Sequence, residues 1–106
     1  MARLLVTQYG WKEDPYGDTL TREGWGAWGN KLTIDACALT DSAVELIRAK
    51  PMDWIKVDFK DGTAPLARQY QDRAPEKEPR CDLYMPEGFN KRFPDYAEVT
   101  LVESVS

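Results

Sequence analysis

Six short apolar segments, separated by turn residues, constrain the fold of this 106-residue chain more than any other feature. Alternation of apolar and polar residues, or a run of apolar and β-branched residues, predicts that each segment is a strand. The segments are residues 4–9, 32–39, 54–59, 66–70, a stretch that carries Asp82, and 96–105. Six short strands in one small domain favour an all-β, mainly β fold, a closed barrel in which no strand edge is left exposed.

Two connections of this predicted barrel have clear local signals. Asp61-Gly62, between the third and fourth segments, is typical of a tight hairpin turn. Thr40 or Asp41 can cap a short helix that Pro51 would end. Its apolar stripe consists of Ala43, Val44, Leu46 and Ile47. A second short helix is predicted before the last strand, with Phe89 and Phe93 on one side.

Composition excludes several classes of function. The net charge is −4 and the basic residues are scattered, so nucleic acid is not expected as a partner. The absence of histidine excludes Ser-His-Asp and Cys-His catalysis and most zinc sites. Cys37 and Cys81 are too few for a metal site, and we expect no cofactor. They form either one disulfide or two buried thiols, and we favour thiols.

No segment is apolar over the length needed for membrane insertion. Near the start, residues 4–6 are the only large apolar run, shorter than the roughly 7–15 residues of a signal-peptide core. We therefore expect a cell-envelope or extracellular location if a leader has been removed, and a phage or cytoplasmic one otherwise.

The stretch from Gln71 to Pro86 carries the most specific motif. It reads Asp72-Arg73-Ala74-Pro75 and then Arg80-Cys81-Asp82-Leu83. This resembles the signature of rare-lipoprotein-A-like proteins, and its spacing is similar to that of three-aspartate (3D) domains and membrane-bound lytic transglycosylase A. The resemblance implies a single six-stranded double-psi β-barrel over residues 1–106, with one or two short helices, a fold shared with expansins.

The same resemblance implies glycan chemistry at two carboxylates. Asp82 matches the general acid of the lytic transglycosylase, and Asp72 matches a required aspartate of rare-lipoprotein-A-like enzymes. We expect them side by side on neighbouring strands, where one of the two would titrate high. The structural alternative is that Asp72 caps a turn and Asp82 bonds backbone amides. Two departures from the family pattern are Cys37 in place of a histidine and Ala74 in place of a glycine.

Further residues are predicted to contact substrate. Thr7 and Tyr9 lie where the first strand enters the family's cleft, and Arg73 can hold a carboxylate of a peptide stem or neutralise the aspartates. Alternation along the second strand predicts Cys37 in the groove, with Cys81 turned away into the core. The segment 10–31 is rich in tryptophan, which either packs as core or forms a sugar-stacking platform. These tryptophans are Trp11, Trp25 and Trp28.

The predicted function is cleavage of peptidoglycan glycan strands, by lytic transglycosylation in preference to hydrolysis. The alternative is a non-catalytic module, either expansin-like and glycan-binding or a structural part of a phage. The enzyme would have the peptidoglycan glycan as its partner, and the module would have a glycan or a neighbouring subunit. Both interpretations leave the oligomeric state open.

Overall fold

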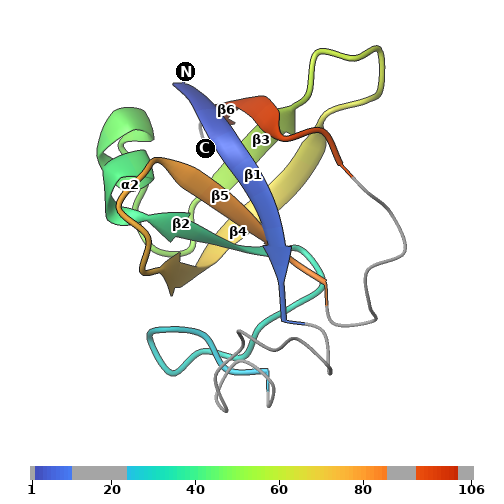
Figure 1. Ribbon diagram of the computed structural model, residues 1–106. Coiled ribbons are helices and arrows are strands. Elements are labelled where there is room, and N and C mark those ends of the chain that lie inside the picture. The colour runs from blue at the N-terminus through green and yellow to red at the C-terminus, as the bar shows by residue number, and fades with distance from the viewer. Residues whose placement is uncertain (1, 11–23, 86–92, 103–106) are drawn as a thin grey trace.

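Six strands close on themselves in the computed structural model, which describes residues 2–10, 24–85 and 93–102 (Figure 1). The elements are β1 (Ala2–Tyr9), β2 (Ala36–Thr40), α2 (Asp41–Ile47), β3 (Trp54–Asp58), β4 (Leu66–Ala74), β5 (Arg80–Tyr84) and β6 (Tyr96–Leu101). Around the barrel the order is β1-β5-β2-β4-β3-β6. The prediction of a mainly β, closed six-stranded barrel is confirmed, with one short helix in the part of the chain that the structure describes.

The strand pairing has an internal symmetry. Two pairs are parallel, β1 with β5 and β2 with β4, and the other four pairs are antiparallel. Exchanging β1 with β4, β2 with β5 and β3 with β6 leaves this pairing pattern unchanged. One consequence is that β4 and β5 lie on either side of β2. The prediction that Asp72 and Asp82 occupy neighbouring strands is therefore wrong, because β2 pairs with both of their strands.

Alternating side chains fill the barrel interior. On β1, Leu4 and Val6 are buried, and on β3 Ile55 and Val57 are fully buried. The predicted β3–β4 hairpin is confirmed, with Val57 opposite Leu66. Because buried apolar residues recur at every second position of β1 and β3, each of these two strands turns one face into the shared core.

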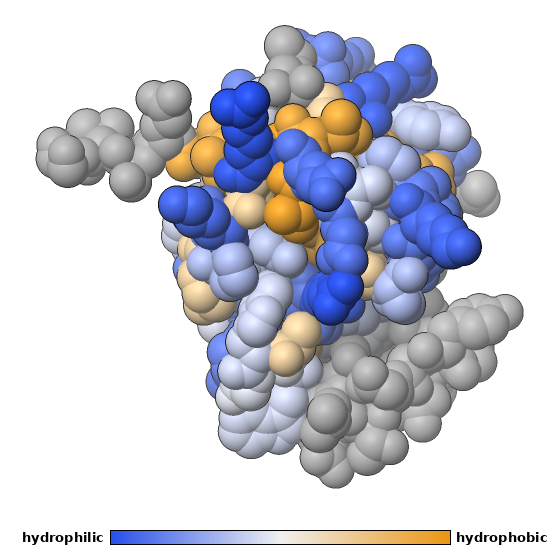
Figure 2. All heavy atoms as spheres, turned by 90° about the vertical axis from the view of Figure 1, so that its left-hand side faces the viewer, coloured by the Kyte–Doolittle hydropathy of each residue, from blue (hydrophilic) through white to orange (hydrophobic). Residues whose placement is uncertain are grey.

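Helix α2 begins at its predicted cap and ends earlier than predicted. Thr40 Oγ1 accepts hydrogen bonds from the backbone N–H groups of Ala43 (3.4 Å) and Arg80 (2.9 Å). The helix ends at Arg48, whose left-handed φ of 57° breaks the helical bonding before Pro51. The predicted stripe is wrong at Leu46, which is 55% exposed. Figure 2, which views the side of α2, shows an apolar patch ringed by hydrophilic side chains.

Several strand bounds differ from the prediction. Strand β2 starts at Ala36, because a turn in which the Ala36 N–H donates to Thr33 O (3.0 Å) precedes it. Strand β4 continues past Tyr70, since its partner β2 pairs with it as far as Ala74. The predicted helix at Phe89 lies outside the described residues, as does the end of the last predicted strand. None of the described helices is long and apolar enough to cross a membrane.

Candidate active site

Both candidate carboxylates lie on one face of the sheet. Thr7 is in register with Asp82, Asp82 is opposite Ala38, and Ala38 is in register with Asp72. Side chains in register point to the same face, so β1, β5, β2 and β4 present these four residues as one row. Asp82 and Asp72 flank Ala38, two strand spacings or about 10 Å apart between Cα atoms.

Asp82 is held by Thr7. The Thr7 hydroxyl donates a hydrogen bond to Asp82 Oδ1 (2.9 Å) across the parallel pair of β1 and β5. Thr7 faces this way because Val6 beside it points into the core. Asp82 is half-buried, so its carboxyl group is oriented by the protein and still reaches the surface.

Asp72 is more enclosed, and the donors that hold it include a hydroxyl and a backbone N–H. It is 8% exposed, its Oδ2 accepts from the Tyr9 hydroxyl (3.1 Å), and its Oδ1 accepts from the Arg73 N–H (2.9 Å). Burial raises the pKa of Tyr9 far above its usual value, and the negative charges of Asp72 and Asp82 raise it further. Tyr9 therefore stays protonated and lies within the field of both carboxylates.

A bulge beside Asp72 fastens a loop to β4. The register of β2 and β4 shifts between Cys37 and Ala38, which leaves Gln71 as an extra, buried residue. Its side chain accepts from Thr33 N (2.9 Å) and donates to Thr33 Oγ1 (2.7 Å), and its backbone carbonyl accepts from Asn30 Nδ2 (3.0 Å). Sequence reasoning missed Gln71, because its polar side chain gave no signal of burial.

This loop, residues 24–35, carries two of the predicted platform tryptophans. Figure 1 shows it at the end of the barrel away from both termini. Trp25 is 41% exposed beneath the Lys31 ammonium, and Trp28 is 44% exposed with an edge contact to Tyr70 at 5.0 Å. Of the two alternatives for the tryptophans, packing as core does not hold for these two residues, because both are exposed. Trp11 lies outside the described residues.

The cysteines do not diverge as predicted. Both are free, as expected, and both are fully buried in the core. Cys37 is opposite Leu83 and Leu39 is opposite Cys81, so alternation places all four side chains on the interior face. A hydrogen bond to Cys81, together with burial, raises the pKa of Cys37 well above its usual value. Cys37 therefore cannot contact substrate, which corrects that prediction.

Arg73 faces an acid that the sequence did not single out. Its Nε and Nη2 donate to the two carboxylate oxygens of Asp41 (2.8 and 2.5 Å), and this hydrogen bonding lowers the pKa of Asp41. A pocket of about 300 Å³ lies at this pair and is lined also by Ala74 and Pro75. Thus Arg73 neighbours Asp72 in the chain, and its guanidinium is paired with Asp41.

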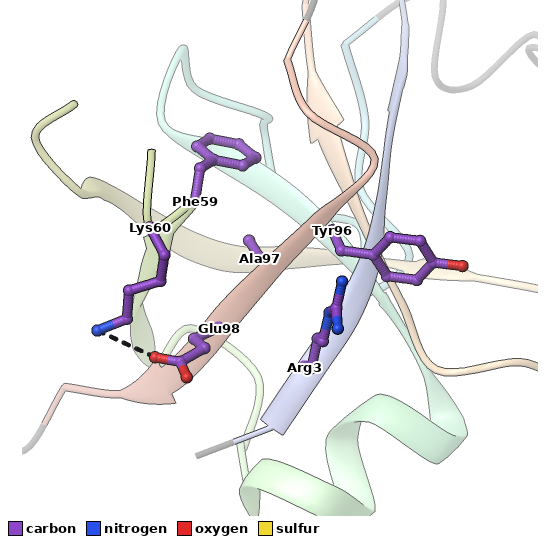
Figure 3. A pocket seen from close by; sticks show the side chains of 6 residues that line it. All are labelled: Arg3, Phe59, Lys60, Tyr96, Ala97 and Glu98. Carbon is purple, nitrogen blue, oxygen red and sulfur yellow. Dashed lines mark ion pairs between the residues drawn. The ribbon is translucent and has the colours of Figure 1, made fainter. Parts of the chain in front are cut away.

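A second pocket, of about 250 Å³, lies at the other end of β1 (Figure 3). The Arg3 guanidinium stands 4.9 Å from the centre of the Tyr96 ring. Lys60 forms ion pairs with Glu98 (3.1 Å) and Asp58 (3.5 Å). No candidate residue from the sequence lies in this pocket.

Comparison with known proteins adds no relative: no protein-family model matches the chain, and the search of curated proteins found no match. Among the residues described, no group of three or more potential ligand side chains is placed to hold a metal ion.

Proposed function

We propose that this protein cleaves peptidoglycan glycan strands by lytic transglycosylation, with Asp82 as general acid and Asp72 as its partner. The observation that carries the proposal is the row across four strands, in which two oriented carboxylates flank Ala38 on one face. The symmetric strand pairing supports the further proposal that the barrel is of the double-psi type, related to rare-lipoprotein-A-like and three-aspartate domains.

The chemistry needs one acid and one acceptor for a proton. Asp82 gives its proton to the glycosidic oxygen as the bond from that oxygen to C1 of the muramyl sugar breaks. The 6-hydroxyl oxygen of the same sugar then bonds to C1, which yields a 1,6-anhydro end. Its proton passes through the Tyr9 hydroxyl to Asp72. This route suits a tyrosine that stays protonated and donates to a buried carboxylate.

A binding module without chemistry is the second candidate. The half-exposed rings of Trp25 and Trp28 favour it, because flat aromatic faces bury the apolar faces of sugar rings. In this form the protein would be expansin-like, or part of a phage structure.

Incubation with purified glycan strands, followed by mass analysis for 1,6-anhydro ends, tests the proposal. We expect the ends to appear with the natural protein and to be lost with Asp82→Asn, while sugar binding persists. Sugar binding without any released product would favour the binding module instead.

A further inference from the structure

The pocket of Figure 3 opens where strand β6 extends beyond its pairing with β3. The pairing ends at Asp58 and Glu98, whereas β6 begins two residues earlier, at Tyr96. Strand β3 ends at Asp58, and Lys60 has a left-handed φ of 56°, which takes the chain out of the extended conformation. A space of about 250 Å³ remains beside Tyr96 and Ala97. The hollow therefore follows from the course of the backbone.

Two cations line this pocket, and one of them is paired with acids. The Lys60 ammonium forms ion pairs with Glu98 (3.1 Å) and Asp58 (3.5 Å). Arg3 is exposed and in register with Glu98 across β1 and β6. Figure 3 shows the Glu98 carboxylate turned towards Lys60 and away from Arg3. In the part of the chain that the structure describes, no acid forms an ion pair with Arg3. The Arg3 guanidinium is therefore the charge that a ligand could use.

An aromatic ring holds this guanidinium. Its central carbon lies 4.9 Å from the centre of the Tyr96 ring. A ring against the face of a guanidinium favours the cation and leaves the N–H groups at the edge of its plane accessible. These N–H groups form a fork that fits the two oxygens of a carboxylate. Arg3 thus combines a favoured position with donors that suit a carboxylate.

The remaining lining is apolar. Phe59 is half-buried and stacks on Phe93, with ring centres 5.3 Å apart and planes inclined by 6°. Ala97 is buried and lies between Phe59 and Arg3 in Figure 3. A molecule that spans the pocket would meet an aromatic side chain at one end and a cation at the other. Flat aromatic groups pack well on a phenylalanine ring, so a ligand with a ring and an anionic group matches both ends.

We propose that this pocket binds a small aromatic carboxylate, whose carboxylate bonds to the Arg3 guanidinium and whose ring packs against Phe59. The site goes beyond the proposed cleavage and does not depend on it. Arg3 and Thr7 belong to the same strand, but Thr7 bonds to Asp82, whereas Arg3 contacts Tyr96. The pocket of Figure 3 is thus a binding site separate from the carboxylate row.

Two probes of nearly equal shape test the charge requirement. Titrations of the natural protein with benzoate and with benzamide, followed by two-dimensional NMR, would give the Kd of each and locate the residues whose signals shift. We expect benzoate to bind about tenfold more tightly than benzamide, the gain typical of a charge-assisted hydrogen bond. Acetate has the carboxylate but no ring, and should bind about tenfold more weakly than benzoate. The largest shifts should be those of Arg3, Phe59 and Ala97.

Substitutions at Arg3 test its role directly. Arg3→Ala should remove the difference between benzoate and benzamide and leave benzamide binding unchanged, which shows that the pocket is intact. Arg3→Lys should keep part of the difference, because lysine has the charge without the planar fork. Tyr96→Phe should keep all of it, because the ring remains.

Arg73→Ala is the matched control, since Arg73 is an exposed arginine in the other pocket. Equal affinities for benzoate and benzamide would overturn the proposal. A difference that survives Arg3→Ala, or no binding of benzoate at millimolar concentrations, would overturn it as well. None of these results bears on glycan cleavage at Asp82, so the two proposals stand or fall separately.

Discussion

Two pockets of similar size lie on this barrel, and their chemistry differs. The pocket of Figure 3 has about 250 Å³ and the pocket at Arg73 about 300 Å³, and each contains an ion pair with exposed side chains. In the first pocket, Lys60 bonds to Glu98 and Asp58, while Arg3 rests on Tyr96. In the second region, Arg73 of the pocket directly follows Asp72 in the chain, and Thr7 and Tyr9 hold Asp82 and Asp72 by hydrogen bonds. Neither the volume of the pocket nor the presence of an exposed ion pair therefore distinguishes the two regions.

The two regions differ in whether buried neighbouring residues fix the orientation of the charged side chains. Exposed ion pairs contribute little to stability and leave their side chains mobile. A carboxylate that is 8% exposed and bonded to a tyrosine hydroxyl and a backbone N–H is fixed in one direction. Such preorganised groups are the ones that catalysis can use, so substitutions near the carboxylates should have larger effects than matched substitutions elsewhere.

The largest expected effect is on turnover, from Asp82→Asn. An asparagine keeps the shape and the contact with Thr7 but has no proton to give, so the rate of anhydro-end formation should fall about 10²- to 10⁴-fold. Glu98→Gln, in the pocket of Figure 3, should leave the rate unchanged. If both substitutions lowered the rate equally, the carboxylates would be no more important for turnover than the pocket of Figure 3.

The next effect concerns the tryptophan loop, through Gly26→Ala. An added Cβ would lie 2.3 Å from the Gln71 carbonyl oxygen and 2.7 Å from the Asn30 side chain, so the loop must move off β4. We expect a loss of about 3 kcal/mol in the free energy of unfolding and a changed tryptophan fluorescence spectrum. Gly62→Ala is the contrast, at a turn away from the site with φ +89° and nothing within 4 Å. It should cost about 1 kcal/mol through backbone strain alone, with the spectrum unchanged.

A smaller effect is expected from Tyr9→Phe. The substitution removes the hydroxyl that bonds Asp72 and leaves one oxygen of a largely buried carboxylate without that donor. We expect a loss of about 2 kcal/mol in urea unfolding and a fall of about tenfold in turnover. Tyr96→Phe, at a ring that is 50% exposed, should change neither quantity. Full activity of the Tyr9→Phe protein would exclude Tyr9 from the proton route.

The sequence was informative where alternation is regular. Trp54 to Asp58 alternates without interruption, and Asp61-Gly62 marks the turn after it, so this hairpin could be predicted. Cys37 could not be oriented, because the residues from Ala36 to Thr40 are all buried and show no alternation. Gln71 could not be predicted as a bulge, since a bulge depends on the pairing of distant strands.

The sequence predicted some residues of the candidate site but not their arrangement. The motif singled out Asp72 and Asp82, and the resemblance to the family's cleft singled out Thr7 and Tyr9. The sequence did not predict that β2 separates the carboxylates, or that Arg73 bonds to Asp41. Both depend on strand order and on side-chain packing between elements that are far apart along the chain.

The last prediction concerns alkaline pH, because burial raises the pKa of one cysteine and three tyrosines. Their ordinary pKa values are 9.0 for Cys37 and 10.0 for Tyr9, Tyr70 and Tyr84. In the folded protein all four pKa values are raised, so above these pH values the unfolded chain releases protons that the folded protein keeps. The free energy of unfolding is then fully present below pH 9 and is lost as pH rises.

The loss should begin near pH 9 with Cys37 and steepen above pH 10, by up to about 1.4 kcal/mol per pH unit for each group. Urea unfolding at pH 7, 9, 10 and 11 measures it. Tyr9→Phe removes one group that stays protonated when folded, so its slope above pH 10 should be shallower than that of the natural protein. Tyr96→Phe is the control, and its free energy of unfolding should fall with pH as steeply as that of the natural protein. If Tyr9→Phe also retained the full slope, Tyr9 would titrate like an exposed tyrosine, and the hydrogen bond to Asp72 would not keep its proton in place.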